Sequence, residues 1–166
     1  MNKHARLILK GNTYIKRDDD YETHSGILKD LLPFIKDYNV IYDPFYCKGT
    51  IIQEWKKLNK ECINDDKDAF KREHPENYDL IFSNIPFSIK KKCFELFLSL
   101  NKPFIVLTTI DSLGGKWIKP YFDKFQFIIP NGRYNFIKNG ILTKGSWLDT
   151  CFICYGLNLE KDIIKL

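Results

Sequence analysis

The sequence has little arginine, no internal repeat, no low-complexity linker and no long hydrophobic run. It contains 26 basic residues, of which only four are arginine, against 21 acidic residues, so that the formal net charge is +5. No segment approaches the roughly 18 consecutive apolar residues that a membrane-spanning helix needs. The first 20 residues also lack the apolar stretch of a signal sequence. We therefore expect neither a membrane protein nor a secreted protein.

The five cysteines do not form a recognisable metal or disulfide framework. Their odd number favours reduced thiols inside a cell. Cys151 and Cys154 have the C-x-x-C spacing, but the second pair of a zinc site is missing. They lie in a predicted strand, where a separation of three residues points side chains to opposite faces. We expect two buried thiols here and no metal.

The length of 166 residues allows one domain with a proper core. A domain of roughly 150 residues buries about 68–70% of the surface that its unfolded chain exposes. Hydrophobic residues make up 44% of the chain, as in folded proteins. We expect residues 1–166 to form a single domain with an irregular N-terminal extension over residues 1–20. No room remains for a separate target-recognition domain.

Apolar strands alternate with amphipathic helices along the chain. The predicted helices span residues 23–35, with a kink or early end at Pro33, 50–58, 89–100 and part of 112–125. The predicted strands span residues 39–42, 61–64, 78–83, 103–110, 126–130 and 150–157. This alternation predicts an α/β fold, a mostly parallel sheet with helices on both faces. The last two strands are expected to form an antiparallel C-terminal edge.

The first predicted strand ends in the segment DPFYCKGT, residues 43–50. An acid at a strand end, followed by a tight loop into a helix, is typical of a nucleotide-binding turn, in which Gly49 lets the backbone approach a ligand. Asp43 can accept hydrogen bonds from an ammonium group or from amides. The loop lacks the glycines of a phosphate cradle, which favours a zwitterionic cofactor. An Asx-type turn closed by glycine is the purely structural alternative.

The third predicted strand ends in Asn84-Ile85-Pro86-Phe87. An amino group on an aromatic ring is a poor nucleophile because its lone pair is delocalised. Two acceptors aimed at its N–H bonds favour a tetrahedral nitrogen, and the Asn84 side-chain oxygen and the Ile85 carbonyl can be those acceptors. Pro86 restricts the backbone, and Phe87 offers a face on which a flipped base can stack. Taken alone, these four residues are more typical of a turn after a strand.

Together, the two motifs resemble those of S-adenosylmethionine-dependent adenine methyltransferases. D-P-F-x-x-x-G resembles their cofactor motif, and N-I-P-F resembles their catalytic [DNS]-P-P-[YFW] motif. The longer strings DPFYCKG and YDLIFSNIPFS resemble minimal N6-adenine methyltransferase-like proteins of protists and viruses and, more distantly, the cap-specific adenosine methyltransferase. The resemblance runs from Tyr21 to the C-terminus. It implies a Rossmann-like class I methyltransferase fold and an intracellular location, in the cytoplasm, the nucleus or a viral factory.

The resemblance also implies a role for each matching position. Asp43, Phe45 and Gly49 would hold the methionine part of S-adenosylmethionine. Tyr21 and Thr23 match the position of a further cofactor motif, and Cys47 of the same loop is a further cofactor-binding candidate. The acids after the second strand would serve the adenosine part of the cofactor, with Asp65 or Asp66 at the ribose and Asp68 at the adenine amino group. Such a run of acids is also typical of a solvated loop.

The chain departs from the family pattern in three places. Ile85 stands where the family usually has proline, as in the N-[IL]-P-[YF] form of ribosomal RNA adenine dimethyltransferases. The first motif of those enzymes, however, is glycine-rich and lacks D-P-F. The usual helix and strand before the catalytic strand have almost no room, and a target-recognition domain is missing. We therefore expect weak target specificity, or specificity supplied by a protein partner.

Basic and aromatic residues gather near the catalytic motif and in the loop over residues 131–147. This mixture is typical of a surface that holds phosphates and stacks bases. The candidate nucleic-acid-binding residues are Lys90, Lys91, Lys92, Arg133, Lys138 and Trp147. A solvated helix face is the alternative for the three lysines. The loop is long for a compact domain, and we expect it to border the pocket of the target base.

The sequence thus predicts transfer of a methyl group from S-adenosylmethionine to the N6 amino group of adenine in DNA. RNA is the alternative substrate, because the D-P-F motif favours DNA whereas the N-I-P-F form favours RNA. A catalytically inactive methyltransferase-fold subunit of a nucleic-acid-binding complex is an alternative from another class. Methylation of a protein glutamine or of a small molecule through the same geometry is a further one.

Overall fold

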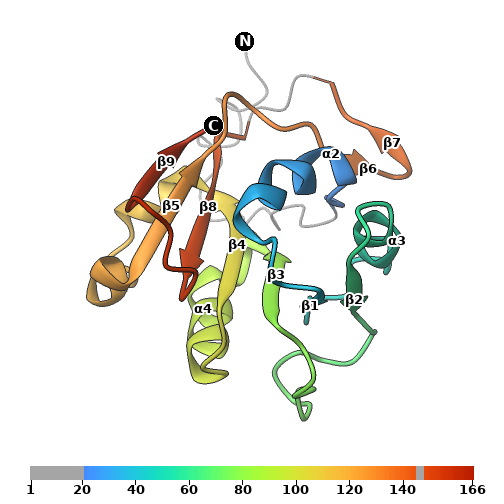
Figure 1. Cartoon of the computed structure of the whole chain (residues 1–166), viewed down its shortest axis with the longest axis horizontal. Helices are drawn as coiled ribbons and strands as arrows, with labels where there is room; N and C mark the ends of the chain where they lie inside the picture. Colours follow the sequence, from blue (N-terminus) through green and yellow to red (C-terminus); the bar gives the residue numbers. More distant parts are fainter. Residues whose placement is uncertain (1–20, 145–147) are drawn as a thin grey trace, which may run out of the picture.

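A computed structural model describes residues 21–144 and 148–166 (Figure 1). The predicted extension over residues 1–20 and the candidate Trp147 lie outside the described residues. The strands are β1 Val40–Tyr42, β2 Glu61–Ile63, β3 Leu80–Asn84, β4 Phe104–Thr109, β5 Phe125–Ile129, β6 Ile137–Lys138, β7 Ile141–Leu142, β8 Thr150–Tyr155 and β9 Ile163–Lys165. The α-helices are α2 Ser25–Leu28, α3 Ile51–Lys56 and α4 Lys90–Ser99. The 3-10 helices are η1 Lys29–Phe34, η2 Phe87–Ile89, η3 Ile110–Gly114 and η4 Lys119–Lys124.

Seven of the strands form one sheet in the order β2-β1-β3-β4-β8-β5-β9. Strands β2, β1, β3 and β4 are parallel to one another, and β9 is parallel to β5. Strand β8 runs antiparallel to both of its neighbours, β4 and β5. The predicted α/β fold with a mostly parallel sheet is therefore confirmed.

The predicted antiparallel pairing of the last two predicted strands is present, but one further strand lies outside this pair. Strands β5 and β8 do pair antiparallel, but β8 lies inside the sheet, and β9 forms the edge. Residues 150–154 of β8 are all buried, as expected for a strand covered on both faces. Strand β9 has only three residues in a charged tail, too few for an alternating pattern to indicate a strand.

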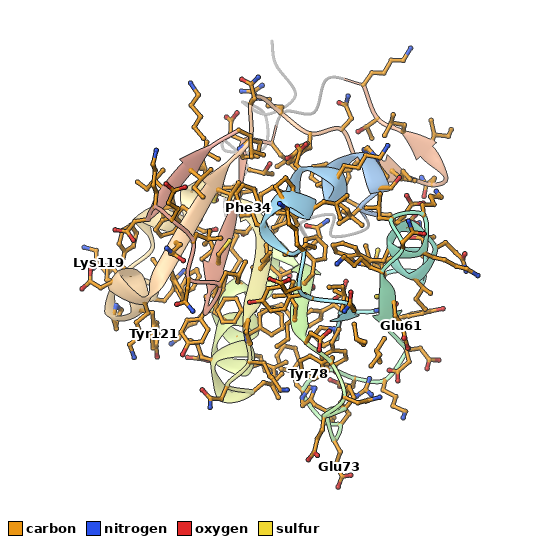
Figure 2. The ribbon with its side chains drawn as sticks, viewed as in Figure 1. Phe34, Glu61, Glu73, Tyr78, Lys119 and Tyr121 are labelled. Atoms are coloured by element: carbon orange, nitrogen blue, oxygen red, sulfur yellow. The ribbon has the colours of Figure 1, made fainter. Side chains whose placement is uncertain are left out.

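The two faces of the sheet carry two separate apolar cores. Along β4, Ile105 and Leu107 belong to the core that also holds residues of α2 and α3, whereas Phe104 and Val106 belong to the core that holds residues of α4. This alternation follows from the strand geometry, in which successive side chains point to opposite faces. Helices cover both faces, as predicted, and Figure 2 shows the side chains that fill the space between the layers.

The C-x-x-C pair follows the same alternation. Cys151 lies in the core on the α4 side and Cys154 in the opposite core, which confirms that the two thiols point to opposite faces. All five cysteines are free thiols. Burial raises the pKa of Cys151 to about 12 and raises the pKa of Cys154 as well, which keeps both thiols protonated and unreactive.

The helices are shorter than the hydrophobic pattern predicts. Helix α2 gives way after four residues to the 3-10 helix η1, which contains Pro33, in agreement with the early end expected at this proline. Residues 112–125 form only 3-10 turns in place of a helix. Residues 64–79 contain no helix or strand, so that the expected compression is present and β2 lies at an edge of the sheet. Among the described helices, none is long and apolar enough to cross a membrane.

Trp55 is the largest fully buried side chain, and it packs edge-on against Phe82 of β3 at a centroid distance of 5.2 Å. We predict that Trp55→Ala lowers the free energy of unfolding by about 3–5 kcal/mol, because it leaves a cavity in the core. Trp55→Phe should lower the free energy of unfolding by less, about 1–2 kcal/mol, because phenylalanine keeps an aromatic ring in the core. The substitution also removes a buried indole N–H that has no described partner, which partly offsets the loss. Urea unfolding measures both variants, and equal losses would contradict this account.

Candidate active site

The order of the strands reverses at β1. The chain passes from β1 to its neighbour β2 on one side and then crosses back to β3 on the other side. In open α/β sheets, a crevice forms outside the carboxyl ends of the strands at such a reversal, and ligands bind there. Asp43 follows β1 directly, and Asn84 is the last residue of β3. The fold therefore brings the two predicted motifs to the carboxyl ends of two adjacent strands, where a ligand crevice is expected.

The Asp43 carboxylate is buried, with 5% of its surface exposed. Its Oδ1 atom accepts a hydrogen bond from the Phe45 N–H at 3.1 Å, which forms the Asx-type turn that the sequence also allows. Burial raises the pKa of Asp43 to about 7, although the hydrogen bond from the Phe45 N–H lowers it in part. No lysine or arginine of the described residues forms an ion pair with it. An ammonium or amide donor of a ligand would favour its ionised form.

The loop after β1 is closed by two successive residues in the left-handed region, Lys48 with φ of 57° and Gly49 with φ of 69°. A Cβ atom on Gly49 would lie 2.5 Å from the ring of Tyr46. Glycine is therefore required here by the fold of the loop itself. The ring of Tyr46 is half-exposed and covers the loop.

Phe45 and Cys47 contribute to this loop in different ways. The Phe45 ring lies between Phe70 and Phe97, at centroid distances of 5.7 and 6.0 Å, and packs against the α4-side core. The Phe45 side chain therefore anchors the loop to the α4-side core and does not point toward the ends of β1 and β3. The Cys47 N–H donates to the Phe45 carbonyl at 3.1 Å, and its thiol is partly buried.

Glu22 is the site residue that the sequence prediction missed. It is only 4% exposed, and its carboxylate accepts hydrogen bonds from Lys48 Nζ at 3.1 Å and Thr50 Oγ1 at 2.8 Å. Its backbone forms two hydrogen bonds with Ile137, at 2.8 and 2.9 Å. Glu22 thus joins the N-terminal segment, the loop after β1 and the loop over residues 131–147. Its partners are 26 or more residues away, so that no local pattern could have indicated them.

Asn84 presents a buried acceptor to the crevice. Its Nδ2 atom donates to the Tyr21 carbonyl at 3.3 Å, which orients the amide. Its Oδ1 atom is buried and has no hydrogen-bond partner among the described residues. An unpaired buried acceptor costs about 1–3 kcal/mol, so that such atoms are rare unless a ligand or water completes them. This atom is the one that the sequence predicts to accept from an amino group.

Four further buried side-chain oxygens lack a described partner: Thr23 Oγ1, Asn64 Oδ1, Ser83 Oγ and Thr150 Oγ1. Asn64 follows β2, and its Nδ2 atom donates to the carbonyls of Asp43 at 2.8 Å and Phe45 at 3.3 Å. Unpartnered buried acceptors therefore lie at the end of β3, in Asn84, and directly after β2, in Asn64, whereas the end of β1 carries the buried carboxylate of Asp43. Such a set fits S-adenosylmethionine, which offers an ammonium group, hydroxyl groups, an adenine amino group and a positive sulfonium.

The three acids predicted to bind adenosine differ in their contacts. Asp65 forms ion pairs with Arg72 and Lys67. The exposed Asp68 accepts from the Phe70 N–H at 2.9 Å, which, together with Lys71, lowers its pKa. Of the three acids, Asp66 alone makes no hydrogen bond or ion pair within the described residues, and it is exposed. It is therefore the acid most available to a ligand.

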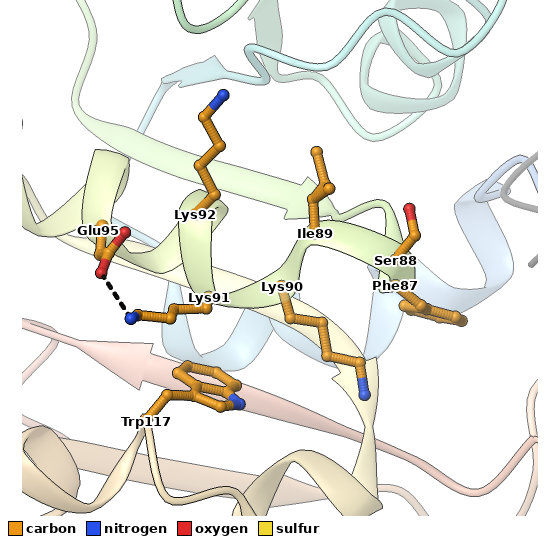
Figure 3. A pocket seen from close by; sticks show the side chains of 8 residues that line it. All are labelled: Phe87, Ser88, Ile89, Lys90, Lys91, Lys92, Glu95 and Trp117. Carbon is orange, nitrogen blue, oxygen red and sulfur yellow. Dashed lines mark ion pairs between the residues drawn. The ribbon is translucent and has the colours of Figure 1, made fainter. Parts of the chain in front are cut away.

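The remaining residues of the catalytic motif lead into α4. The Ile85 side chain is buried in the α4-side core, with 2% exposed. The Pro86 carbonyl accepts from the Ile89 N–H at 3.1 Å, which begins the turn η2. The Phe87 ring is half-buried and lines a surface cavity of about 430 Å³ with Trp117 and residues 88–92 and 95 (Figure 3). The stacking face predicted for Phe87 thus borders a cavity.

The three lysines that follow the motif are not equivalent. Lys90 has a side chain that is only 10% exposed, and its Nζ donates to Thr109 Oγ1 at 2.6 Å, Asp111 Oδ1 at 2.9 Å and Ser112 Oγ at 2.8 Å. It therefore fastens the start of α4 to the end of β4 and is not placed to hold a phosphate. Two exposed lysines remain, Lys91, which pairs with Glu95 at 3.6 Å, and Lys92, which lies 4.1 Å from the ring of Phe70.

The other nucleic-acid candidates lie in the loop after β5. Arg133 forms an exposed two-point ion pair with Asp149, at 2.7 and 3.2 Å. The Lys138 Nζ lies 5.1 Å from the centroid of the Tyr21 ring. Since the Tyr21 carbonyl accepts from Asn84, Lys138 lies beside the segment that contacts Asn84, and its role at the target pocket stays a prediction.

Comparisons with known proteins add no assignment to this geometry. No protein-family model matches the chain, and a search of curated proteins finds no significant match. The interpretation of the site therefore depends on the chemistry of its own residues.

We predict that Asp43→Asn becomes increasingly stabilising as pH rises. Asp43 in the folded protein binds its proton up to about pH 7, whereas in the unfolded chain it ionises near its ordinary pKa of 3.8. The parent protein therefore loses stability between these two pH values, and asparagine does not. The difference in free energy of unfolding should grow by roughly 2–4 kcal/mol between pH 4 and pH 8. A difference independent of pH, measured by urea unfolding, would contradict the raised pKa.

We also predict that Lys90→Met lowers the free energy of unfolding by about 1–3 kcal/mol, because it removes three hydrogen bonds from a charged donor. Lys91→Met is the matched control one residue away, and it should change stability by less than about 0.5 kcal/mol, since its ion pair is exposed. Thermal or urea unfolding measures the free energy of unfolding of both variants. Similar small losses in the two variants would show that the Lys90 contacts contribute little to stability.

Proposed function

We propose that the protein transfers a methyl group from S-adenosylmethionine to the N6 amino group of adenine in DNA. The observation that carries the proposal is the buried, unpaired Asn84 Oδ1 at the end of β3, beside the buried Asp43 at the end of β1. These two groups lie on opposite sides of the strand-order reversal. The strand order, with β8 antiparallel between β4 and β5, is consistent with a Rossmann-like class I methyltransferase core.

The cofactor side of the proposed site consists of acceptors. The Asp43 carboxylate and the Thr23 hydroxyl would hold the ammonium end of S-adenosylmethionine, and Asp66 would accept from its ribose hydroxyls. When bound, the cofactor supplies an electrophilic methyl group on a positive sulfur. The Glu22 carboxylate, with its partners Lys48 and Thr50, would keep the loop after β1 in the shape that this binding needs.

The target side consists of the catalytic motif. Asn84 Oδ1 and the Ile85 carbonyl would accept the two N–H bonds of the adenine amino group and favour a nitrogen lone pair free to attack. Phe87 would stack on the base. No general base is required before the attack, because the amino proton becomes acidic only once the nitrogen is alkylated. The contribution of the chain is therefore positioning and preorganised acceptors.

The nucleic-acid surface in this proposal is modest. Lys91 and Lys92 remain exposed beside the motif, whereas Lys90 is used within the fold. Because few basic side chains remain exposed beside the motif, we propose weak affinity for the nucleic-acid backbone. Phosphate contacts carry no sequence information, and we propose that target specificity is weak or is supplied by a protein partner. RNA remains the alternative substrate, since the N-I-P-F form of the motif favours it. The unpaired Asn84 Oδ1 destabilises the fold, and in a catalytically inactive subunit no bound substrate would offset this loss.

We predict that Asn84→Ala abolishes methylation and leaves cofactor binding nearly unchanged. Removing one preorganised polar group of this kind typically costs about 10²–10³ in kcat. Methylation of adenine-containing DNA measures the first effect, and calorimetry with S-adenosylmethionine measures the second. Asn77→Ala is the matched control, because Asn77 is exposed on the loop before β3. A variant that methylates as well as the parent would overturn the role assigned to Asn84.

A further inference from the structure

The loop between β5 and β8 contains a short hairpin with an apolar tip. Strands β6 and β7 are joined by Asn139 and Gly140, with φ of 52° and 75°. Two successive positive φ values are typical of the tight type I′ turn, which holds a hairpin rigidly. The two residues directly after the turn, Ile141 and Leu142, are 72% and 50% exposed. Large apolar side chains placed in solvent at a rigid tip indicate a contact surface.

The hairpin is attached firmly to the catalytic centre. Ile137 pairs with Leu142 on one side and with Glu22 on the other, so that the Glu22 segment, β6 and β7 form a three-stranded ribbon. The base of the hairpin is closed by the Thr143 N–H, which donates to the Phe136 carbonyl at 2.7 Å. The tip therefore cannot move independently of the segment that contacts Asn84.

One row of this ribbon leads from the catalytic motif to the tip. Tyr21, Lys138 and Ile141 lie opposite one another in successive strands, and residues opposite one another in a ribbon project from the same face. The Lys138 Nζ lies 5.1 Å from the Tyr21 ring, in agreement with this placement. With strands about 4.8 Å apart, Ile141 lies roughly 10 Å from the Tyr21 backbone, whose carbonyl holds Asn84.

The charge around the hairpin fits a polyanion. Residues 131–144 contain Arg133, Lys138 and Lys144 and no aspartate or glutamate; Arg133 is paired with Asp149, so the two lysines carry the local positive charge. An aromatic ring, a cation and an apolar side chain in one row are the components of a surface that contacts both the bases and the phosphates of a nucleic acid. Apolar side chains that insert between base steps unstack them.

We propose that Ile141, at the tip of the β6–β7 hairpin, enters the base stack of duplex DNA beside the target adenine and holds it open. This inference rests on the proposed function, because chemistry at the amino group of a paired base requires that base to leave the stack. In this arrangement Ile141 occupies the gap in the duplex, Lys138 lies along the adjacent backbone, and the Asn84 amide receives the base.

The first experiment measures base opening without methyl transfer. A DNA duplex carries 2-aminopurine at the target position, and its fluorescence rises when the base leaves the stack. We expect the parent protein to raise this fluorescence and the double variant Ile141→Ser, Leu142→Ser to lose most of the rise. Ile163→Ser is the matched control, because Ile163 is 64% exposed on β9, at the other side of the molecule (Figure 1). A parent protein that binds the duplex without changing its fluorescence overturns the proposal.

The second experiment compares methylation of two duplexes, one fully paired and one with the target adenine opposite an abasic site. We expect the double variant to lose about 10-fold or more on the paired duplex and to stay within about 3-fold of the parent on the opened one, because opening costs a few kcal/mol. Equal losses on both duplexes, or no loss on either, overturn the proposal. If light scattering shows that the variant and the parent differ in oligomeric state, the hairpin tip is an interface between protein chains, and the base-opening proposal is overturned. A parent that opens the base but never methylates it overturns the proposed function alone.

Discussion

The candidate site depends on one feature of the sheet, the reversal of strand order at β1. Because the chain moves from β1 outward to β2 and then returns to the other side of β1 for β3, no crossover covers the gap between the ends of β1 and β3. The residues that leave those two strands, Asp43 and Asn84, therefore face a shared crevice. Asn84 carries a buried oxygen without a described partner, and burial raises the pKa of Asp43 to about 7; both features cost stability, as is typical of sites shaped for a ligand.

Most of the fold can be predicted from the sequence, because strands covered on both faces are nearly continuous apolar runs. Residues 104–109 of β4 are all buried, and the prediction for this strand is correct to within one residue. Two elements could not be found in this way. The three residues of β9 depend on pairing with β5 rather than on a pattern of their own. The β6–β7 hairpin carries a local signal, Asn139-Gly140, but its strands have only two residues each.

The site could be predicted only in part. A motif shows which residue types follow a strand, but it does not show which groups the ends of long side chains will contact. Asn84 and Asp43 lie where their strand positions indicate. Lys90 was expected on a nucleic-acid surface, yet its ammonium group returns to the end of β4, a contact across 19 residues or more. Phe45, expected at the cofactor, packs into the core. Glu22 belongs to the site because it accepts hydrogen bonds from Lys48 and Thr50, which are distant in the sequence. Each of these outcomes depends on tertiary contacts that no local pattern contains.

The central claim is that the crevice between β1 and β3 methylates adenine. The most direct measurement is incubation of the protein with isotope-labelled S-adenosylmethionine and a panel of single- and double-stranded DNA and RNA, followed by digestion to nucleosides and mass spectrometry. The account predicts labelled N6-methyladenine nucleoside from DNA. Label in another nucleoside, or none in any nucleic acid while S-adenosylmethionine binds, would contradict it.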